Sequence, residues 1–182
     1  EKDKEYKLER IHDNNNNNED HELNDDNDSN GKSQKEAEMT IALIQAMGRK
    51  AIGIQADLAI ESEVEHLIPM CIKEMGLPDC IVNNASIFEY DDPSTINYDH
   101  LTKMIAINLA APTVLTKRYA QALKEQPSKK GLVVHVLDQK LDNLNPDFFS
   151  YTLSKAALDS AVKMQAMFFA PQLRIMGVAP GI

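Results

Sequence analysis

The stretch GLVVHVLDQKLDNLNPDFFSYTLSKAAL, residues 131–158, joins an apolar run of strand length to the start of a helical pattern. Strand and helix patterns alternate in this way along most of the chain. They cover residues 50–56, 61–75, 79–84, 97–125, 131–138, 150–170 and 173–181. The connections are too long for hairpins, so the alternation predicts βαβ units. We therefore predict a three-layer α/β/α domain built on a parallel sheet.

Polar and turn residues stand where the predicted strands end. These residues are Asp57, the group Asn83 to Ser86, Asp138, and the pair Pro180 and Gly181. Because ligands bind beyond the carboxyl ends of parallel strands, we expect the four groups to converge on one edge of the sheet. His135 alternates with apolar residues inside its strand and is expected in the core.

Tyr151 and Lys155 stand four residues apart and share one helix face, with Asp138 thirteen residues before the tyrosine. An ammonium close to a phenol favours the phenolate, so we expect Lys155 to lower the pKa of Tyr151. The three residues together form a candidate proton-transfer site. Two simpler interpretations stay open. The pair can be a surface feature of an ordinary helix, and Asp138 can cap the turn that follows it.

The composition limits the class of protein. The 182 residues are 43% apolar, enough for one domain with a real core. The net charge is −9, of which residues 1–40 hold −7, so no basic surface for nucleic acid is expected. We also expect no membrane span, no metal site and a cytoplasmic location, with Cys71 and Cys80 as reduced thiols.

The N-terminal segment reads as disordered. Residues 12–30 contain eight Asn, seven acidic residues and one aliphatic side chain, too little apolar surface to drive folding. His12 and His21 could touch a metal there, but a solvated tail explains them as well. The motif SQKE, residues 33–36, is typical of a capping box that starts a helix. We therefore divide the chain into a disordered segment, 1–32, and a folded domain, 33–182.

Four motifs in order carry a family resemblance. They are IVNNAS (81–86), IAINLAAP (105–112), YTLSK (151–155) and GVAPGI (177–182). With these motifs, residues 34–182 resemble the short-chain dehydrogenase/reductase family, which implies a Rossmann-like fold and the cofactor NADPH. By this resemblance Tyr151 is the proton donor, Lys155 holds the nicotinamide ribose, and Asn108 supports the proton relay. The implied cofactor-binding residues are Asp57, Leu58, Asn83, Ala85, Ser86, Tyr151, Lys155, Pro180 and Gly181.

Two details resemble the pteridine reductase branch of that family. Asp138 occupies a position that is usually serine, and NNASIF places Phe88 shortly after Ser86. A flat pterin suits an aromatic platform, and a carboxylate can form hydrogen bonds with its ring nitrogens or relay protons to them. The resemblance therefore implies a pterin substrate bound by Phe88, Asp138 and Tyr151. Ordinary loop packing is the alternative for Phe88.

One part of the family pattern is missing from the sequence. The seven glycines lie at positions 31, 48, 53, 76, 131, 177 and 181, and none are spaced as a phosphate-binding turn. We therefore expect the first strand and its glycine turn to be absent, and NADPH binding by this chain to be weak or nil. Either 50–56 pairs directly with 79–83, or EYKLERI (5–11) or a partner chain fills the gap. The functional alternative is a non-catalytic remnant that keeps the helices at 97–125 and 150–170, through which we expect a homo-oligomer.

Overall fold

The computed structural model describes residues 26–180, which fall into two units, 26–55 and 56–180. The first unit holds helix α1, Asp26–Ala46. The expected disorder of residues 26–30 is therefore wrong, and so is the capping box, because Ser33 lies inside the helix. The rest of the segment predicted to be disordered, residues 1–25, lies outside the described residues.

The strand predicted at 50–56 does not form, since residues 51–57 contain no regular secondary structure. A strand exists only where a neighbour takes up its N–H and C=O groups. In the described sheet, the strand that covers residues 80–83 pairs with one neighbour alone, the strand at 131–136. Direct pairing of 50–56 with 79–83 is therefore also wrong, and EYKLERI lies outside the described residues.

The sheet of the second unit has three parallel strands in the order β1-β2-β3. They are β1 Cys80–Asn83, β2 Gly131–Val136 and β3 Leu173–Val178. In register, Ile81 lies beside Val133 and Val133 beside Ile175, so these three buried side chains form one row. The predicted α/β class with a parallel, Rossmann-like sheet is confirmed.

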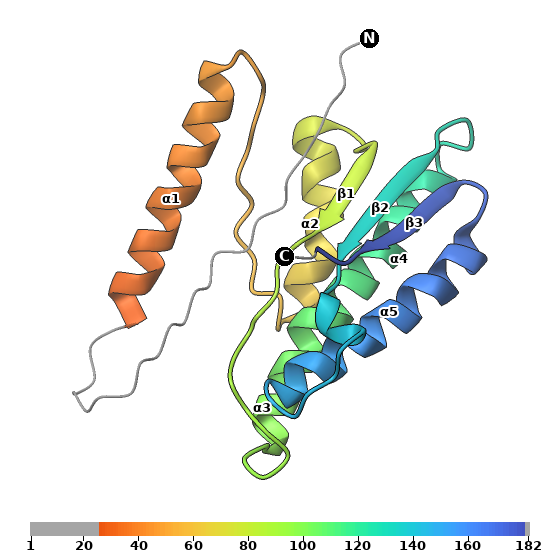
Figure 1. Cartoon of the computed structure of the whole chain (residues 1–182). Helices are drawn as coiled ribbons and strands as arrows, with labels where there is room; N and C mark the ends of the chain where they lie inside the picture. Colours follow the sequence, from red (N-terminus) through yellow and green to blue (C-terminus); the bar gives the residue numbers. More distant parts are fainter. Residues whose placement is uncertain (1–25, 181–182) are drawn as a thin grey trace. The chain divides into compact units, whose positions relative to one another are not determined.

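Helices α2, α4 and α5 lie on one face of this sheet (Figure 1). The helical elements after residue 56 are α2 Glu61–Met75, α3 Tyr98–Ile105, a π-helical turn Ala106–Ala110, α4 Ala111–Lys124, a 3₁₀ turn Gln139–Leu141 and α5 Phe149–Phe169. Along β2, buried residues alternate with partly exposed ones, as expected when helices cover one face more fully. None of the helices in the described part of the chain is both long and apolar enough to cross a bilayer.

The start of β2 is packed closely against α4. The hydroxyl of Tyr119 donates a hydrogen bond to the carbonyl of Pro78 at 2.6 Å. A Cβ atom on Gly131 would lie 2.5 Å from that hydroxyl oxygen and 2.7 Å from Cδ1 of Leu123. Only glycine fits this contact, which fixes the distance between the strand and the helix.

Candidate active site

Tyr151 lies in the first turn of α5 and is buried. Its hydroxyl donates a hydrogen bond to Oδ2 of Asp138 at 2.6 Å. The other carboxylate oxygen, Oδ1, accepts from the backbone N–H of Lys140 at 2.8 Å and caps the 3₁₀ turn. Asp138 therefore serves both roles that the sequence left open. It caps a turn with one oxygen and meets the tyrosine with the other.

Lys155 lies one turn further along α5, with its side chain buried beneath the site. Its ammonium donates to the backbone carbonyl of Val136 at 2.8 Å and lies 5.6 Å from the centroid of the Tyr151 ring. Burial lowers the pKa of Lys155 to about 8, against the opposing charge of Asp138. The structure thus brings Tyr151, Lys155 and Asp138 together at the end of β2.

The predicted direction of the Tyr151 pKa is wrong for this arrangement. Burial is the largest cause, and it raises the pKa of Tyr151 above its ordinary value. The hydrogen bond to Asp138 and the charge of that carboxylate act in the same direction. The phenol therefore keeps its proton at neutral pH.

Three aromatic rings form one wall of the site. Phe88 stacks on Phe148 with centroids 4.0 Å apart, and meets the Tyr151 ring edge-on at 4.6 Å. The ammonium of Lys140 lies 4.7 Å from the centroid of Phe148, a cation–π distance. Phe88 is 54% exposed despite these contacts, so part of the aromatic residue beside Tyr151 remains open to solvent. Sequence reasoning missed Phe148, whose only signal is its place three residues before the tyrosine.

Asn108 is buried in the π-helical turn and holds the loop after β1. Its Oδ1 accepts from the backbone N–H of Ile87 at 2.9 Å and from the hydroxyl of Ser86 at 3.1 Å. Its Nδ2 donates to the Ile87 carbonyl at 3.0 Å and to the hydroxyl of Ser154 on α5 at 3.1 Å. Asn108 therefore fixes this loop to the helix that bears Tyr151. The role in a proton relay stays a prediction.

Asn83 lies at the end of β1, with Ala85 two residues further along the same loop. Nδ2 of Asn83 lies 3.3 Å from Nδ1 of His135, and Nε2 of His135 lies 3.3 Å from Oγ1 of Thr116. His135 is fully buried, as predicted, and burial together with the charge of Lys155 lowers its pKa to about 4. The imidazole is therefore neutral and links the strand end to α4.

The remaining predicted cofactor residues are spread more widely. Oδ1 of Asp57 accepts from the backbone N–H of Ala59 at 2.8 Å, in the turn before α2. Leu58 packs against the buried cluster that includes Tyr151. Pro180 is the last described residue, and Gly181 lies outside the described range. No group of three His, Cys, Asp or Glu side chains within the described residues is arranged to hold a metal ion.

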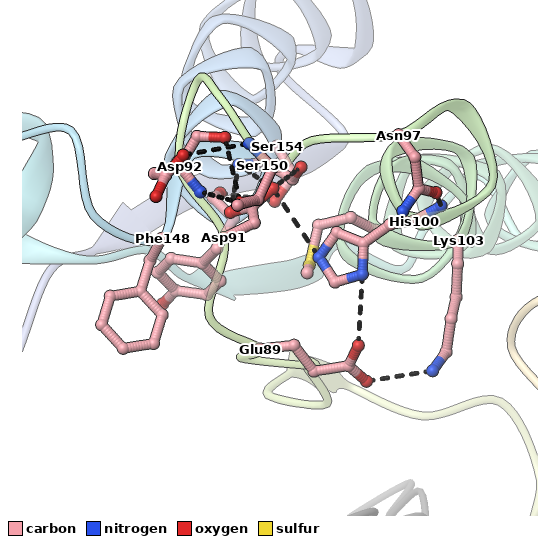
Figure 2. A network of polar contacts seen from close by, with 12 residues as sticks. Glu89, Asp91, Asp92, Asn97, His100, Lys103, Phe148, Ser150 and Ser154 are labelled. Atoms are coloured by element: carbon pink, nitrogen blue, oxygen red, sulfur yellow. Dashed lines mark hydrogen bonds and ion pairs between the residues drawn. The ribbon is translucent and has the colours of Figure 1, made fainter. Parts of the chain in front are cut away.

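Asp91, a buried acidic residue in the loop after β1, contacts the start of α5 (Figure 2). Sequence reasoning missed this residue. Both carboxylate oxygens of Asp91 accept from the backbone N–H of Ser150, at 3.0 and 3.2 Å, and Oδ2 also accepts from the Ser150 hydroxyl. Nε2 of His100 lies 3.7 Å from Asp91 Oδ2, while its Nδ1 lies 3.4 Å from Glu89. The Lys103 ammonium bonds to Glu89 at 2.9 Å. No short sequence spacing marks Asp91, because its partner is 59 residues away.

Comparison with known proteins places this geometry in context. The profile of the short chain dehydrogenase family matches residues 29–182. The solved structure of FolM alternative dihydrofolate reductase 1 from Brucella suis, in complex with NADP, is 36% identical with a TM-score of 0.76, covering 82% of this chain and 61% of that one. Dihydromonapterin reductase from Enterobacter sp. (strain 638) is 28% identical over 71% of this chain and 54% of its own length.

An uncharacterized oxidoreductase from Thermotoga maritima is 28% identical over 82% of this chain. The matched region makes up 58% of that protein's own length. The chain thus spans about three fifths of the length of the relatives that it matches.

Proposed function

The chain belongs to the short-chain dehydrogenase family, and from this premise we propose that it carries the catalytic end of an NADPH-dependent reductase of pteridines. The observation that carries the proposal is the 2.6 Å hydrogen bond from Tyr151 to Asp138, beside the open aromatic surface of Phe88. A protonated phenol, a carboxylate and an aromatic platform are the groups that reduction of a flat nitrogen heterocycle needs.

The side chains define the proton path. Tyr151 holds its proton at neutral pH because burial and Asp138 raise its pKa, so it could donate that proton to the ring nitrogen whose neighbouring carbon would gain the hydride. Asp138 is only partly buried, so its carboxylate could take up a proton from solvent and pass it to the tyrosinate after each turnover. Bound NADPH would supply the hydride.

The described residues fit one end of that cofactor. Lys155 and Tyr151 present an ammonium and a hydroxyl at the carboxyl end of β2, where they could hold the nicotinamide ribose. The pyrophosphate end needs backbone N–H groups from a glycine-rich turn, and no glycines of this sequence are spaced to make one. We therefore expect weak binding of NADPH by the 182-residue chain.

The pterin as substrate rests on two supports. Phe88 is 54% exposed and its ring centroid lies 4.6 Å from that of Tyr151, while Asp138 offers an acceptor for ring N–H groups. The relatives from Brucella suis and Enterobacter are named as an alternative dihydrofolate reductase and a dihydromonapterin reductase. Both names denote enzymes that act on pterin rings.

A non-catalytic module that assembles with other chains is the second candidate. Helix α5 exposes three large apolar side chains near its C-terminal end, namely Met164, Met167 and Phe168. Such a row favours a protein contact, and it supports the predicted homo-oligomer through α4 and α5. The missing glycine turn also favours this candidate for the chain by itself.

Two measurements test the proposal. If the gene supplies a glycine-rich turn upstream of Glu1, the complete protein should oxidise NADPH with dihydropterins, followed by absorbance. Tyr151→Phe should lower kcat by about 10²–10⁴-fold, the usual contribution of a general acid. Tyr98→Phe is the matched control, because Tyr98 is 83% exposed. Turnover at the wild-type rate in Tyr151→Phe would contradict the assignment. Micromolar binding of NADPH to the 182-residue chain by calorimetry would contradict the expected weakness.

A further inference from the structure

The first turn of α5 takes its cap from a distant loop. The first N–H groups of a helix have no partner within the helix and need an external acceptor. The residue before α5, Phe148, has a left-handed backbone with φ of 57° and makes no side-chain cap. Asp91 fills that role instead, with both carboxylate oxygens on the N–H of Ser150 and one also on its hydroxyl.

The cap is buried and carries charge. Asp91 is 4% exposed and Ser150 is fully buried, so solvent does not compete for these bonds. A carboxylate at a helix N-terminus also interacts favourably with the helix dipole. The backbone carbonyl of Asp91 accepts a further bond from the N–H of Phe149 at 3.2 Å. The loop and the helix are therefore joined through both the side chain and the backbone of one residue.

This junction lies between two parts of the candidate active site. Ser150 immediately precedes Tyr151, and Asp91 follows Phe88 by three residues in the same loop. Phe88 and Tyr151 meet edge-on, and Phe88 also stacks on Phe148, the residue before α5. A shift of Asp91 relative to Ser150 would move the ring of Phe88 against the phenol of Tyr151.

We propose that Asp91 is a positioning residue, which holds Tyr151 on Asp138 and Phe88 against Tyr151 by capping α5. The hydrogen bonds of Asp91 go to Ser150 and to the backbone of Phe149 and not to either ring, so Asp91 acts through Ser150 and the loop. The consequence for turnover rests on the reductase function proposed above. The positioning itself does not, because it concerns the geometry of the chain alone.

Asp91→Asn tests the cap, and Asp92→Asn is its matched control. Both variants remove one negative charge from adjacent positions in one loop. Asp92 caps its own turn, with Oδ1 on the N–H groups of Ser94 at 2.7 Å and Thr95 at 3.0 Å. Asparagine at position 91 keeps the shape of the side chain but loses its charge. It also replaces one of the two oxygens that accept from the Ser150 N–H by an NH₂ group.

Amide hydrogen exchange is the first measurement, made on the 182-residue chain. Loss of a charge-assisted bond should speed exchange at residues 150–152 by about tenfold or more in Asp91→Asn. The C-terminal half of α5 and the Asp92→Asn control should keep their wild-type rates. Equal rates at residues 150–152 in the two variants would overturn the proposal. Uniform loss of protection over residues 56–180 would overturn it too, since that shows a role in stability alone.

The ionisation of Tyr151 is the second measurement, and it reports the position of the phenol. An alkaline absorbance titration, with the signal assigned by Tyr151→Phe, should show a lower pKa of Tyr151 in Asp91→Asn than in Asp92→Asn. The reason is that the hydrogen bond to Asp138, which raises this pKa, is weakened when the helix start moves. An unchanged Tyr151 titration would overturn the proposal.

Ser150→Ala serves if Asp91→Asn does not fold. It removes the hydroxyl donor and leaves the backbone bonds, so it should shift both readouts in the same direction by less. Wild-type values in both readouts would overturn the proposal. Neither hydrogen exchange nor the Tyr151 titration requires turnover. An inactive complete protein would therefore refute the reductase function, while these two measurements would still test the role of Asp91. If that protein is active, Asp91→Asn should lower kcat while the Kd for NADPH stays unchanged.

Discussion

His135 should make the folded chain sensitive to mild acid. Its pKa is lowered from 6.5 to about 4, while the unfolded chain keeps the ordinary value. Between these two values the unfolded state binds a proton that the folded state refuses, so stability is complete above pH 6.5 and falls as the pH drops toward 4. A gap of about 2.5 pKa units corresponds to roughly 3 kcal/mol of unfolding free energy.

The hydrogen bonds of His135 give the same sign. Thr116 donates its hydroxyl hydrogen to the Pro112 carbonyl at 2.8 Å, so its oxygen is left to accept from Nε2–H of His135. Nδ1 then accepts from the amide of Asn83, and a second proton on the ring would set two donors against each other. Protonation therefore requires the Asn83 amide to turn over or the ring to leave its position.

Urea unfolding at several pH values between 7.5 and 4.5, followed by circular dichroism, measures this effect. Other groups also titrate there, so the informative quantity is the difference between wild type and His135→Gln, which takes up no proton in this range. The stability of wild type relative to His135→Gln should fall by about 2–3 kcal/mol across it. His66→Gln controls for loss of a histidine, since His66 is exposed on α2. Parallel curves for wild type and His135→Gln would refute the reasoning.

Four further outcomes are expected. Gly131→Ala should destabilise the chain by about 1–3 kcal/mol in urea unfolding, because the Cβ of the alanine would displace the Tyr119 hydroxyl from its hydrogen bond to Pro78. Wild-type stability of this variant would show instead that the Tyr119 ring moves freely. The stability of wild type should rise between pH 8 and 9.5, whereas that of Lys155→Met should not. The reason is that the pKa of Lys155 is about 8 in the folded chain and 10.5 in the unfolded chain, so the folded chain releases the proton first and no longer buries a charge. Equal slopes of stability against pH in the two proteins would contradict this. Asp138→Ser should impair pterin reduction by the complete protein more than NADPH binding, measured as kcat against Kd, and equal loss of both would indicate a structural role. The same Asp138→Ser variant should also lower the pKa of Tyr151 in an absorbance titration, because it removes the carboxylate that raises it.

The sequence predicted those elements whose partners are present in the described chain. Strands β1, β2 and β3 and helices α2 and α5 lie within a few residues of their predicted ranges. Asp138, Tyr151 and Lys155 met as expected, because the end of a parallel strand and the start of the next helix necessarily lie at one edge of the sheet.

The errors arise where the outcome depends on distant neighbours. The apolar pattern of residues 50–56 cannot reveal that this segment forms no strand in the described part of the chain. The i, i+4 spacing of Tyr151 and Lys155 suggested a lowered tyrosine pKa, but burial and Asp138 raise it. Asp91 stands next to Asp92 in the chain, and only the fold shows which of the two is buried against α5.

The π-helical turn at Ala106–Ala110 makes chain length itself a constraint. A π turn accommodates one residue more between bonded groups than an α turn, and each residue rotates a helix by about 100°. Deleting one alanine from this turn would let α3 and α4 join as a continuous α-helix, with the two halves turned relative to each other. Either the hydrogen bonds of Asn108 to the loop after β1 would break, or the hydrogen bond from Tyr119 to the Pro78 carbonyl would break. Related proteins should therefore tolerate exchanges of side chains in this segment far more readily than insertions or deletions.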